Sequence, residues 1–300
     1  MDEDNCHCSR VPSRAGESGM IRETLPDGVK LERFESMTEF YRHCERLPSH
    51  EGRYSREHFF GHQDPREAAR YCESGLDERH MRRARELVNK IDASFRDREH
   101  DAWHPAPMGA YAVVPEYLAG EPFPMRMRAR EENDRAPIRY YIECVISAGV
   151  KLDELEARAA AMAALIMRSV EERSIELYAL LPMCPSGSRG YFGVIPIQTH
   201  PIDLHSTIAA FATREFCRAM SFAAAVKAGG GSYNSIRWLY GNPTPDEKGH
   251  RAQQFRKALN MEPQDILMQG GYLSDARLFH SDPVRWVHEQ IEKQRTMDQD

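Results

Sequence analysis

The strongest hydrophobic pattern of the chain covers residues 139–181, where two apolar segments flank a long helical repeat. A buried strand is indicated by IRYYIECVIS, a helix by AGVKLDELEARAAAMAALIMRSVEER, and a second strand by SIELYALL. A strand, a helix and a strand in this order predict two parallel strands joined by a crossover helix. The pattern therefore predicts an α/β fold.

Further elements alternate along the rest of the chain. Strands are predicted at 190–198, 235–241 and 265–271, and helices at 200–231, 246–260 and 282–294. Asp203 or Ser206 is expected to cap the first of these helices, and Asp282 the last. The link from 182 to 189 is short enough for a hairpin, so the strand at 190–198 is expected to be antiparallel to its predecessor. We predict a Rossmann-like, mostly parallel sheet with one antiparallel strand and helices on both faces.

The N-terminal part has a different pattern. Few apolar residues occur before residue 30, which favours a flexible arm. Helices are predicted at 36–46, 64–75 and 77–95, with Ser36, Asp64 and Asp77 as caps. A connector with a short extended segment follows from Trp103 to Pro137. The predicted organisation is an arm over 1–30, a helical region and connector over 31–137, and the α/β domain over 138–300.

Composition narrows the functional class. No apolar run approaches the roughly 18 residues that could span a bilayer, and the acidic N-terminus MDEDNCHCSR is not a secretory signal. Seven cysteines at irregular spacing favour reduced thiols. We therefore expect a cytoplasmic protein without a membrane partner. A net charge of −6 gives no global electrostatic reason to bind nucleic acid.

The element order of residues 138–295 carries a family resemblance. An opening strand, the helix with KLDELEARAAAMAALI, two strands in immediate succession and a later alternation of helices and strands resemble a von Willebrand factor A-like domain. With YLAGEPFPM and FFGHQDPREAARYCESG, the whole chain is also similar to uncharacterised proteins of lytic bacteriophages that carry such a domain. The resemblance implies action in the cytoplasm of an infected bacterium.

The resemblance also implies a place for a metal, which in the family is held by D-x-S-x-S after the first strand. This chain has Glu143, Cys144 and Ser147 there, so at most one acid and one hydroxyl remain. We expect a degenerate site that holds neither Mg²⁺ nor another cofactor. The predicted role of the strand ends is to bind a protein, through Ser147, Gly149, Asp203 and Thr207.

Arginines form a second candidate surface, for nucleic acid or an acidic partner. The arginines of the second and third helices are Arg66, Arg70, Arg79, Arg82, Arg83 and Arg85. Arg126 and Arg128 follow Phe123, and Arg237 precedes Trp238, as in surfaces on which single strands stack. The alternative is an ordinary solvated helix face, because glutamates lie four residues from Arg82 on either side.

No catalytic residue is identified. Cys184 and Ser186 lack the strand–nucleophile–helix context of an esterase elbow, and GGGSYN lacks the Lys-Ser/Thr of a P-loop. We expect a non-catalytic interaction or adaptor protein that binds another protein. The alternatives are a factor that binds single-stranded DNA or recruits RNA polymerase, and an enzyme whose site, for example around His200, Asp203 and His205, is not recognisable from sequence. The oligomeric state stays open.

Overall fold

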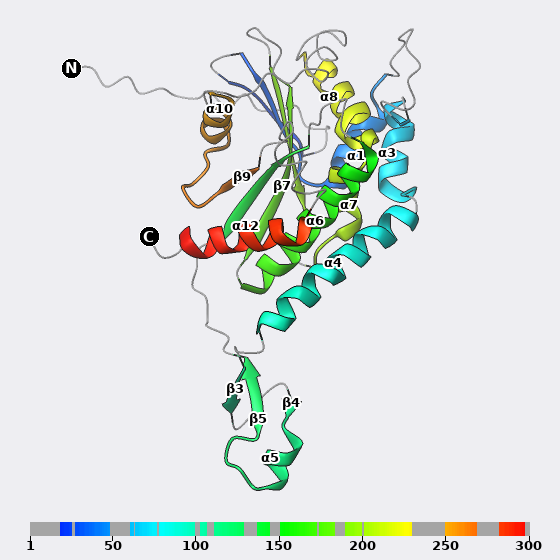
Figure 1. Ribbon diagram of the computed structural model, residues 1–300. Helices are drawn as coiled ribbons and strands as arrows, with labels where there is room; N and C mark the ends of the chain where they lie inside the picture. Colours follow the sequence, from blue (N-terminus) through cyan, green and yellow to red (C-terminus); the bar gives the residue numbers. More distant parts are fainter. Residues whose placement is uncertain are drawn as a thin grey trace, which may run out of the picture.

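A six-stranded sheet forms the centre of the described part of the chain (Figure 1). The computed structural model describes residues 19–25, 28–48, 61–62, 64–76, 78–99, 103–106, 111–128, 137–144, 151–172, 174–183, 190–199, 201–229, 250–268 and 282–297. The strand order is β1-β2-β8-β7-β6-β9. The bounds are β1 (Ile21–Thr24), β2 (Lys30–Arg33), β6 (Ile138–Glu143), β7 (Ile175–Met183), β8 (Tyr191–Ile197) and β9 (Ile266–Met268).

The predicted strand–helix–strand unit is confirmed. β6 and β7 are parallel neighbours joined by α6 (Leu152–Glu172), and β9 is parallel to β6 on its other side. β8 returns antiparallel to β7, as the short link between them predicts. The chain is therefore a mixed α/β protein with a mostly parallel sheet.

Helices cover both faces of this sheet, but unequally (Figure 1). Alternation along β6 directs Ile138, Tyr140 and Ile142 into a large apolar core shared with most of the helices. Tyr141 faces the other way, into a smaller cluster that contains Leu259. The helices on the larger core are α1 (Met37–Glu45), α3 (Pro65–Ser74), α4 (Glu78–Glu99), α6, α7 (Leu204–Ala212), the π-helix η2 (Glu215–Met220), α8 (Ser221–Lys227) and α12 (Pro283–Met297).

The smaller face is packed by α10 (His250–Leu259). None of the helices in the described ranges combines the length and the hydropathy that crossing a bilayer requires.

Two N-terminal strands were missed by the sequence analysis. Residues 21–24, which were expected in a flexible arm, form β1, and β2 lies parallel beside β8. Both β2 and β8 thus run against the other strands, where one antiparallel strand was expected. Each new strand has only four residues, and Leu31 is the one apolar side chain that β2 buries deeply. Four residues are too few to show the alternation of apolar and polar positions that predicts a strand.

Helix starts agree with the predicted caps. Ser36, Asp64 and Asp203 each accept a backbone N–H of the helix that follows, and Asp282 accepts the N–H of Arg285. Asp77 and the strand predicted at 235–241 lie outside the described residues, as does the first part of the predicted arm. The helix predicted over 200–231 is divided at Thr213 into α7, η2 and α8.

The predicted connector forms a small sheet of its own, which we call the projecting module (residues 103–106 and 111–128). It contains β3 (Trp103–Ala106), β4 (Tyr111–Ala112), α5 (Val114–Leu118) and β5 (Met125–Arg128), in the strand order β3-β5-β4. Gly120 takes a positive φ of 76° in the turn after α5. Val113 N–H donates to Pro124 O and closes the loop. The module lies beyond one end of the main sheet (Figure 1).

A buried ion pair fastens β9 to the centre of the sheet. Arg139 of β6 contacts the Asp265 carboxylate with two nitrogens, Nε to Oδ1 at 3.0 Å and Nη2 to Oδ2 at 2.8 Å. The Asp265 side chain is fully buried and also accepts the N–H of Glu262. A bidentate pair of this kind fixes orientation as well as distance.

We predict that Asp265→Asn lowers the free energy of unfolding by about 3 kcal/mol or more, because it leaves the Arg139 guanidinium partly buried without its counter-charge. Chemical denaturation measures this change. The control is Glu289→Gln, which removes the exposed pair with Arg285 on α12 and is expected to change stability little. Equal stability of the two variants would contradict the assignment.

His43 on α1 is held in its neutral form. Its Nε2 is buried and has no hydrogen-bond partner among the described residues, and its ring packs 5.5 Å from that of Phe34. Burial, together with the nearby cations Arg22 and Arg46, lowers the pKa of His43 to about 4. The folded protein therefore resists protonation at this position.

Between pH 6.5, the ordinary pKa of histidine, and about pH 4, the unfolded chain binds a proton at His43 that the folded chain does not. We predict that the free energy of unfolding falls as pH is lowered across this interval, and that it falls less in His43→Gln. Denaturation at a series of pH values measures both slopes. Identical slopes would show that His43 does not carry this dependence.

Candidate functional site

The residues predicted at the strand ends are not all at one end of the sheet. Ser147 and Gly149, which follow β6, lie outside the described residues. Asp203 follows β8, which runs antiparallel to β7, and nearby Thr199 donates from Oγ1 to the carbonyl of Ile175 at the start of β7. Asp203 and Thr207 therefore lie at the end of the sheet where β7 begins, away from the carboxyl end of β6.

Asp203 and Thr207 have structural partners there. The Asp203 carboxylate accepts the N–H of Ser206 at 2.9 Å and its hydroxyl at 2.6 Å. Thr207 is fully buried and donates from Oγ1 to Asp203 O. His205 contacts the carbonyl of Cys72 through Nε2 at 2.9 Å. Asp203 and His205 thus have separate partners among the described residues.

The predicted arginine surface is divided among several elements. Arg66 and Arg82 are exposed on α3 and α4. Arg70 lies 3.6 Å from a carboxylate oxygen of Glu45, and Arg83 pairs with the buried Glu156 of α6. The side chains of Arg79, Arg126 and Arg128, and the whole of Arg237, lie outside what the structure describes. Arg83 therefore links α4 to α6.

The carboxyl end of β6 contains buried polar groups. Glu143 and Arg158 are almost fully buried, and Arg158 Nη2 donates to Glu143 O at 2.6 Å. Burial raises the pKa of the Cys144 thiol well above its ordinary value, and neighbouring Cys217 raises it further. A protonated, inaccessible thiol is a packing group. Among the described residues, no three His, Cys, Asp or Glu side chains come together as a metal site requires.

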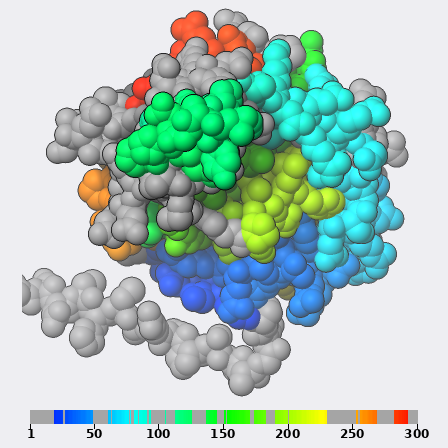
Figure 2. Space-filling model, turned by 90° about the horizontal axis from the view of Figure 1, so that it is seen from below, coloured from blue at the N-terminus to red at the C-terminus, as the bar shows by residue number. Residues whose placement is uncertain are grey.

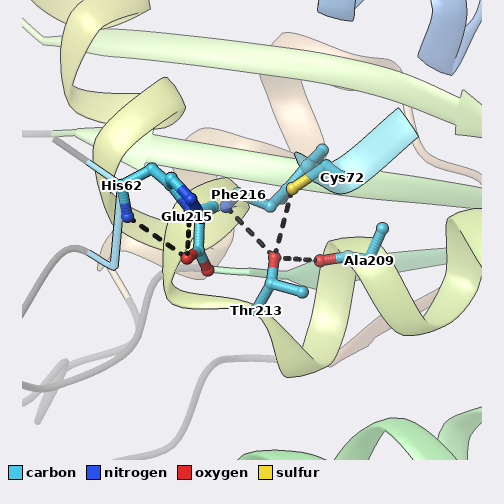
Figure 3. Close-up of polar contacts among 6 residues, drawn as sticks. All are labelled: His62, Cys72, Ala209, Thr213, Glu215 and Phe216. Carbon is cyan, nitrogen blue, oxygen red and sulfur yellow. Dashed lines mark hydrogen bonds and ion pairs between the residues drawn. The ribbon is translucent and has the colours of Figure 1, made fainter. Parts of the chain in front are cut away.

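A polar cluster joins α3 to the break between α7 and η2 (Figure 3). Thr213 Oγ1 donates to Ala209 O at 2.6 Å and accepts the N–H of Phe216 at 3.2 Å. Cys72 Sγ of α3 lies 3.4 Å from the same oxygen. One hydroxyl therefore satisfies backbone groups on both sides of the break, where the regular helical hydrogen bonds are interrupted.

Glu215, at the start of η2, joins a second segment to this cluster (Figure 3). Its Oε1 accepts the N–H of His62 at 3.2 Å and lies 3.1 Å from His62 Nδ1. Gly61 has a φ of 66°, and a Cβ at this position would overlap the Glu215 carboxylate. The close approach of the segment to η2 therefore requires glycine at 61.

The contacts of this cluster hold neighbouring helices together. A π-helix is often found at functional sites, and a thiol beside a hydroxyl, a carboxylate and a histidine contains groups used in nucleophilic catalysis. Burial, however, raises the pKa of Cys72 far above its ordinary value. The thiol stays protonated at neutral pH, and the cluster holds α3, α7 and η2 together.

The projecting module carries the clearest exposed feature. Of the six exposed large apolar side chains in the described residues, four belong to it, and we call them the apolar patch: Val114 (62% exposed), Tyr117 (65%), Leu118 (78%) and Phe123 (51%). Figure 2 looks onto the end of the molecule where the module (green) lies in front of the body. Several exposed large apolar side chains on one small module mark it as a candidate binding site.

The sequence analysis named Phe123 and missed the other three residues. The signal was present: Val114, Tyr117 and Leu118 have the i, i+3, i+4 spacing of one helix face. This spacing ordinarily predicts a face that packs against a core. Here α5 has no buried residue, so its apolar face is left to solvent.

Comparison with known proteins gives a family. A family model described as a domain of unknown function, DUF7192, matches residues 17–266. Neither the curated proteins nor the solved structures gave a match. The matched range begins before β1 and extends to the first residue of β9, so it includes the N-terminal strands and the projecting module together with most of the main sheet.

We predict that Thr213→Val lowers the free energy of unfolding by about 1–3 kcal/mol, because it removes the buried hydroxyl that donates to Ala209 O and accepts the N–H of Phe216. The control is Thr207→Val, since the buried Thr207 hydroxyl donates only to the carbonyl of its own helix. Denaturation should show the larger loss for Thr213→Val. A larger loss for Thr207→Val would contradict the role given to Thr213.

Proposed function

The chain belongs to the DUF7192 family of unknown function, and we propose that it is a non-catalytic interaction protein that binds another protein through the apolar patch. The main sheet and its helices act as a rigid base, and the projecting module presents the patch. The observation that carries the proposal is the exposure of Val114, Tyr117, Leu118 and Phe123 on one small module.

The physical argument is the cost of leaving these side chains in water. Burying apolar surface is favourable by roughly 25 cal/mol per Å², and large aromatic side chains are frequent among the residues that dominate binding energy. Tyr117 and Phe123 are such side chains, and Leu118 is more exposed than either. A partner that covers the patch removes this cost, which favours association.

The finer assignment of the fold is part of the proposal. The run β8-β7-β6-β9, with β8 antiparallel and α6 joining β6 to β7, supports a von Willebrand A-like relationship. The bacteriophage origin suggested by the sequence makes a protein of the infected bacterium the proposed partner. The proposed binding site, however, differs from the one expected from the sequence. The proposal now rests on the projecting module, because Asp203 and Thr207 do not lie with the carboxyl end of β6.

Binding of single-stranded DNA is the second candidate function. Arg126 and Arg128 lie on β5 of the same module as the exposed rings of Tyr117 and Phe123. Aromatic rings beside basic residues are the usual platform for single strands.

Protein is favoured over DNA by the other residues of the patch. Val114 and Leu118 are aliphatic and offer no ring for a base to stack on. Glu121 is exposed two residues before Phe123, and its carboxylate repels phosphates near the patch.

We predict that a stoichiometric protein partner co-purifies with the tagged full-length chain from its host cells and is lost with Leu118→Asp. Folding of the variant is checked by its denaturation midpoint, which should change little because Leu118 is exposed. The matched control is Ile21→Asp, which places the same charge at an exposed apolar position on β1.

The partner should be retained by the wild-type chain and by the Ile21 variant alone. Retention by Leu118→Asp, or recovery of no partner, would overturn the proposed function. Salt-sensitive retention of the chain on single-stranded DNA, lost on changing Arg126 and Arg128 to Gln, would favour the second candidate instead.

A further inference from the structure

We infer that the partner meets the apolar patch with a short apolar segment flanked by Lys or Arg, and not with the broad face of a folded domain. This inference rests on the proposed function and names the chemistry of the partner. It follows from the size of the patch, from its charge and from the position of the module.

The size of the patch argues for a segment. A large aromatic side chain presents about 150–250 Å², so four side chains at 51–78% exposure offer roughly 400–600 Å². A stable interface between folded domains buries about 800 Å² on each partner. The patch alone is smaller than this, and the module lies beyond the end of the main sheet (Figure 1), so the body adds little area beside it.

The spacing of the patch fits an inserted side chain. Val114, Tyr117 and Leu118 share one face of α5 because they are three and four residues apart. The turn at Gly120 returns the chain, and Val113 N–H to Pro124 O holds the ends of the loop together, so that Phe123 belongs to the same small unit as α5. Aliphatic or aromatic anchors at helical spacing are the usual complement of such a surface.

The charge near the patch favours a partner segment that has Lys or Arg beside its apolar residues. Between residues 113 and 125 the charged residues are Glu116 and Glu121, both acidic. Glu121 is exposed, and its N–H donates to Glu116 O, which keeps the two residues close to each other beside α5. The exposed carboxylate of Glu121, near the edge of the patch, attracts cations on the partner and repels acidic segments. The arginines of the module follow on β5, the central strand of its small sheet.

The test is selection from a random peptide library displayed on phage, with the immobilised full-length chain as target. We expect enriched peptides to share two or three large apolar residues at spacings of three or four, together with Lys or Arg beside them. A synthetic peptide of the consensus sequence then serves as the probe, and its Kd is measured by fluorescence anisotropy.

Two variants separate the apolar and the charged contributions. Leu118→Asp should weaken binding of the consensus peptide at least about tenfold, the effect of losing about 1.4 kcal/mol. Glu121→Lys should weaken binding of the peptide about three- to tenfold, and the difference in Kd from the wild-type chain should be larger at low salt. The matched control is Glu289→Lys, which makes the same charge change on α12, outside the module, and should leave the Kd unchanged.

The failure of this inference can be told apart from failure of the proposed function. Enriched peptides that are apolar without basic residues, or acidic, would overturn the inference, as would equal binding to wild-type and Glu121→Lys chains. No enrichment over the Leu118→Asp chain would overturn it too. In each case a partner that is still lost with Leu118→Asp in the purification would leave the proposed function standing, with a folded surface as the partner.

Discussion

The burial of α6 on nearly all sides is the constraint on which the rest of the structure depends. Every residue from Ala159 to Ile166 is buried, which an amphipathic surface helix would not allow. The sheet covers one side of α6, and α4, α7 and α12 cover the others. The crossover between β6 and β7 therefore exists only because helices from both ends of the chain complete its surroundings. The pair between Arg83 of α4 and the buried Glu156 of α6 links the two helices.

Features that depend on local chemistry could be predicted from the sequence. Caps at Ser36, Asp64 and Asp282 follow from one side chain and the helix next to it, and the strand–helix–strand unit follows from uninterrupted apolar runs. β1 and β2 could not be predicted, because four residues with one deeply buried Leu31 carry too little pattern. The break at Thr213 was missed for a different reason, since it depends on Cys72 of another helix as well as on its own neighbours.

The candidate site was predicted only in part. An i, i+3, i+4 apolar face has the same sequence signal whether a core covers it or solvent does, so α5 gave no indication of exposure. Phe123 was singled out for its neighbouring arginines, and the structure adds Val114, Tyr117 and Leu118 beside it. The residues at the strand ends were grouped from the family resemblance, without drawing the consequence of the antiparallel strand that was itself predicted at 190–198. Because β8 is antiparallel, Asp203 follows it to the other end of the sheet.

The central claim is that the main sheet and its helices form a rigid base, whereas the projecting module presents exposed apolar side chains. The Thr213 contacts and the pair of Arg139 with Asp265 stabilise the main sheet and its helices, and the thiols of Cys72 and Cys144 are buried within them. The most direct test is amide hydrogen exchange of the full chain with and without its co-purified partner. The account predicts new protection confined to the peptides that contain residues 113–125. Protection of β6, β7 and the start of α6, with the module unchanged, would contradict it.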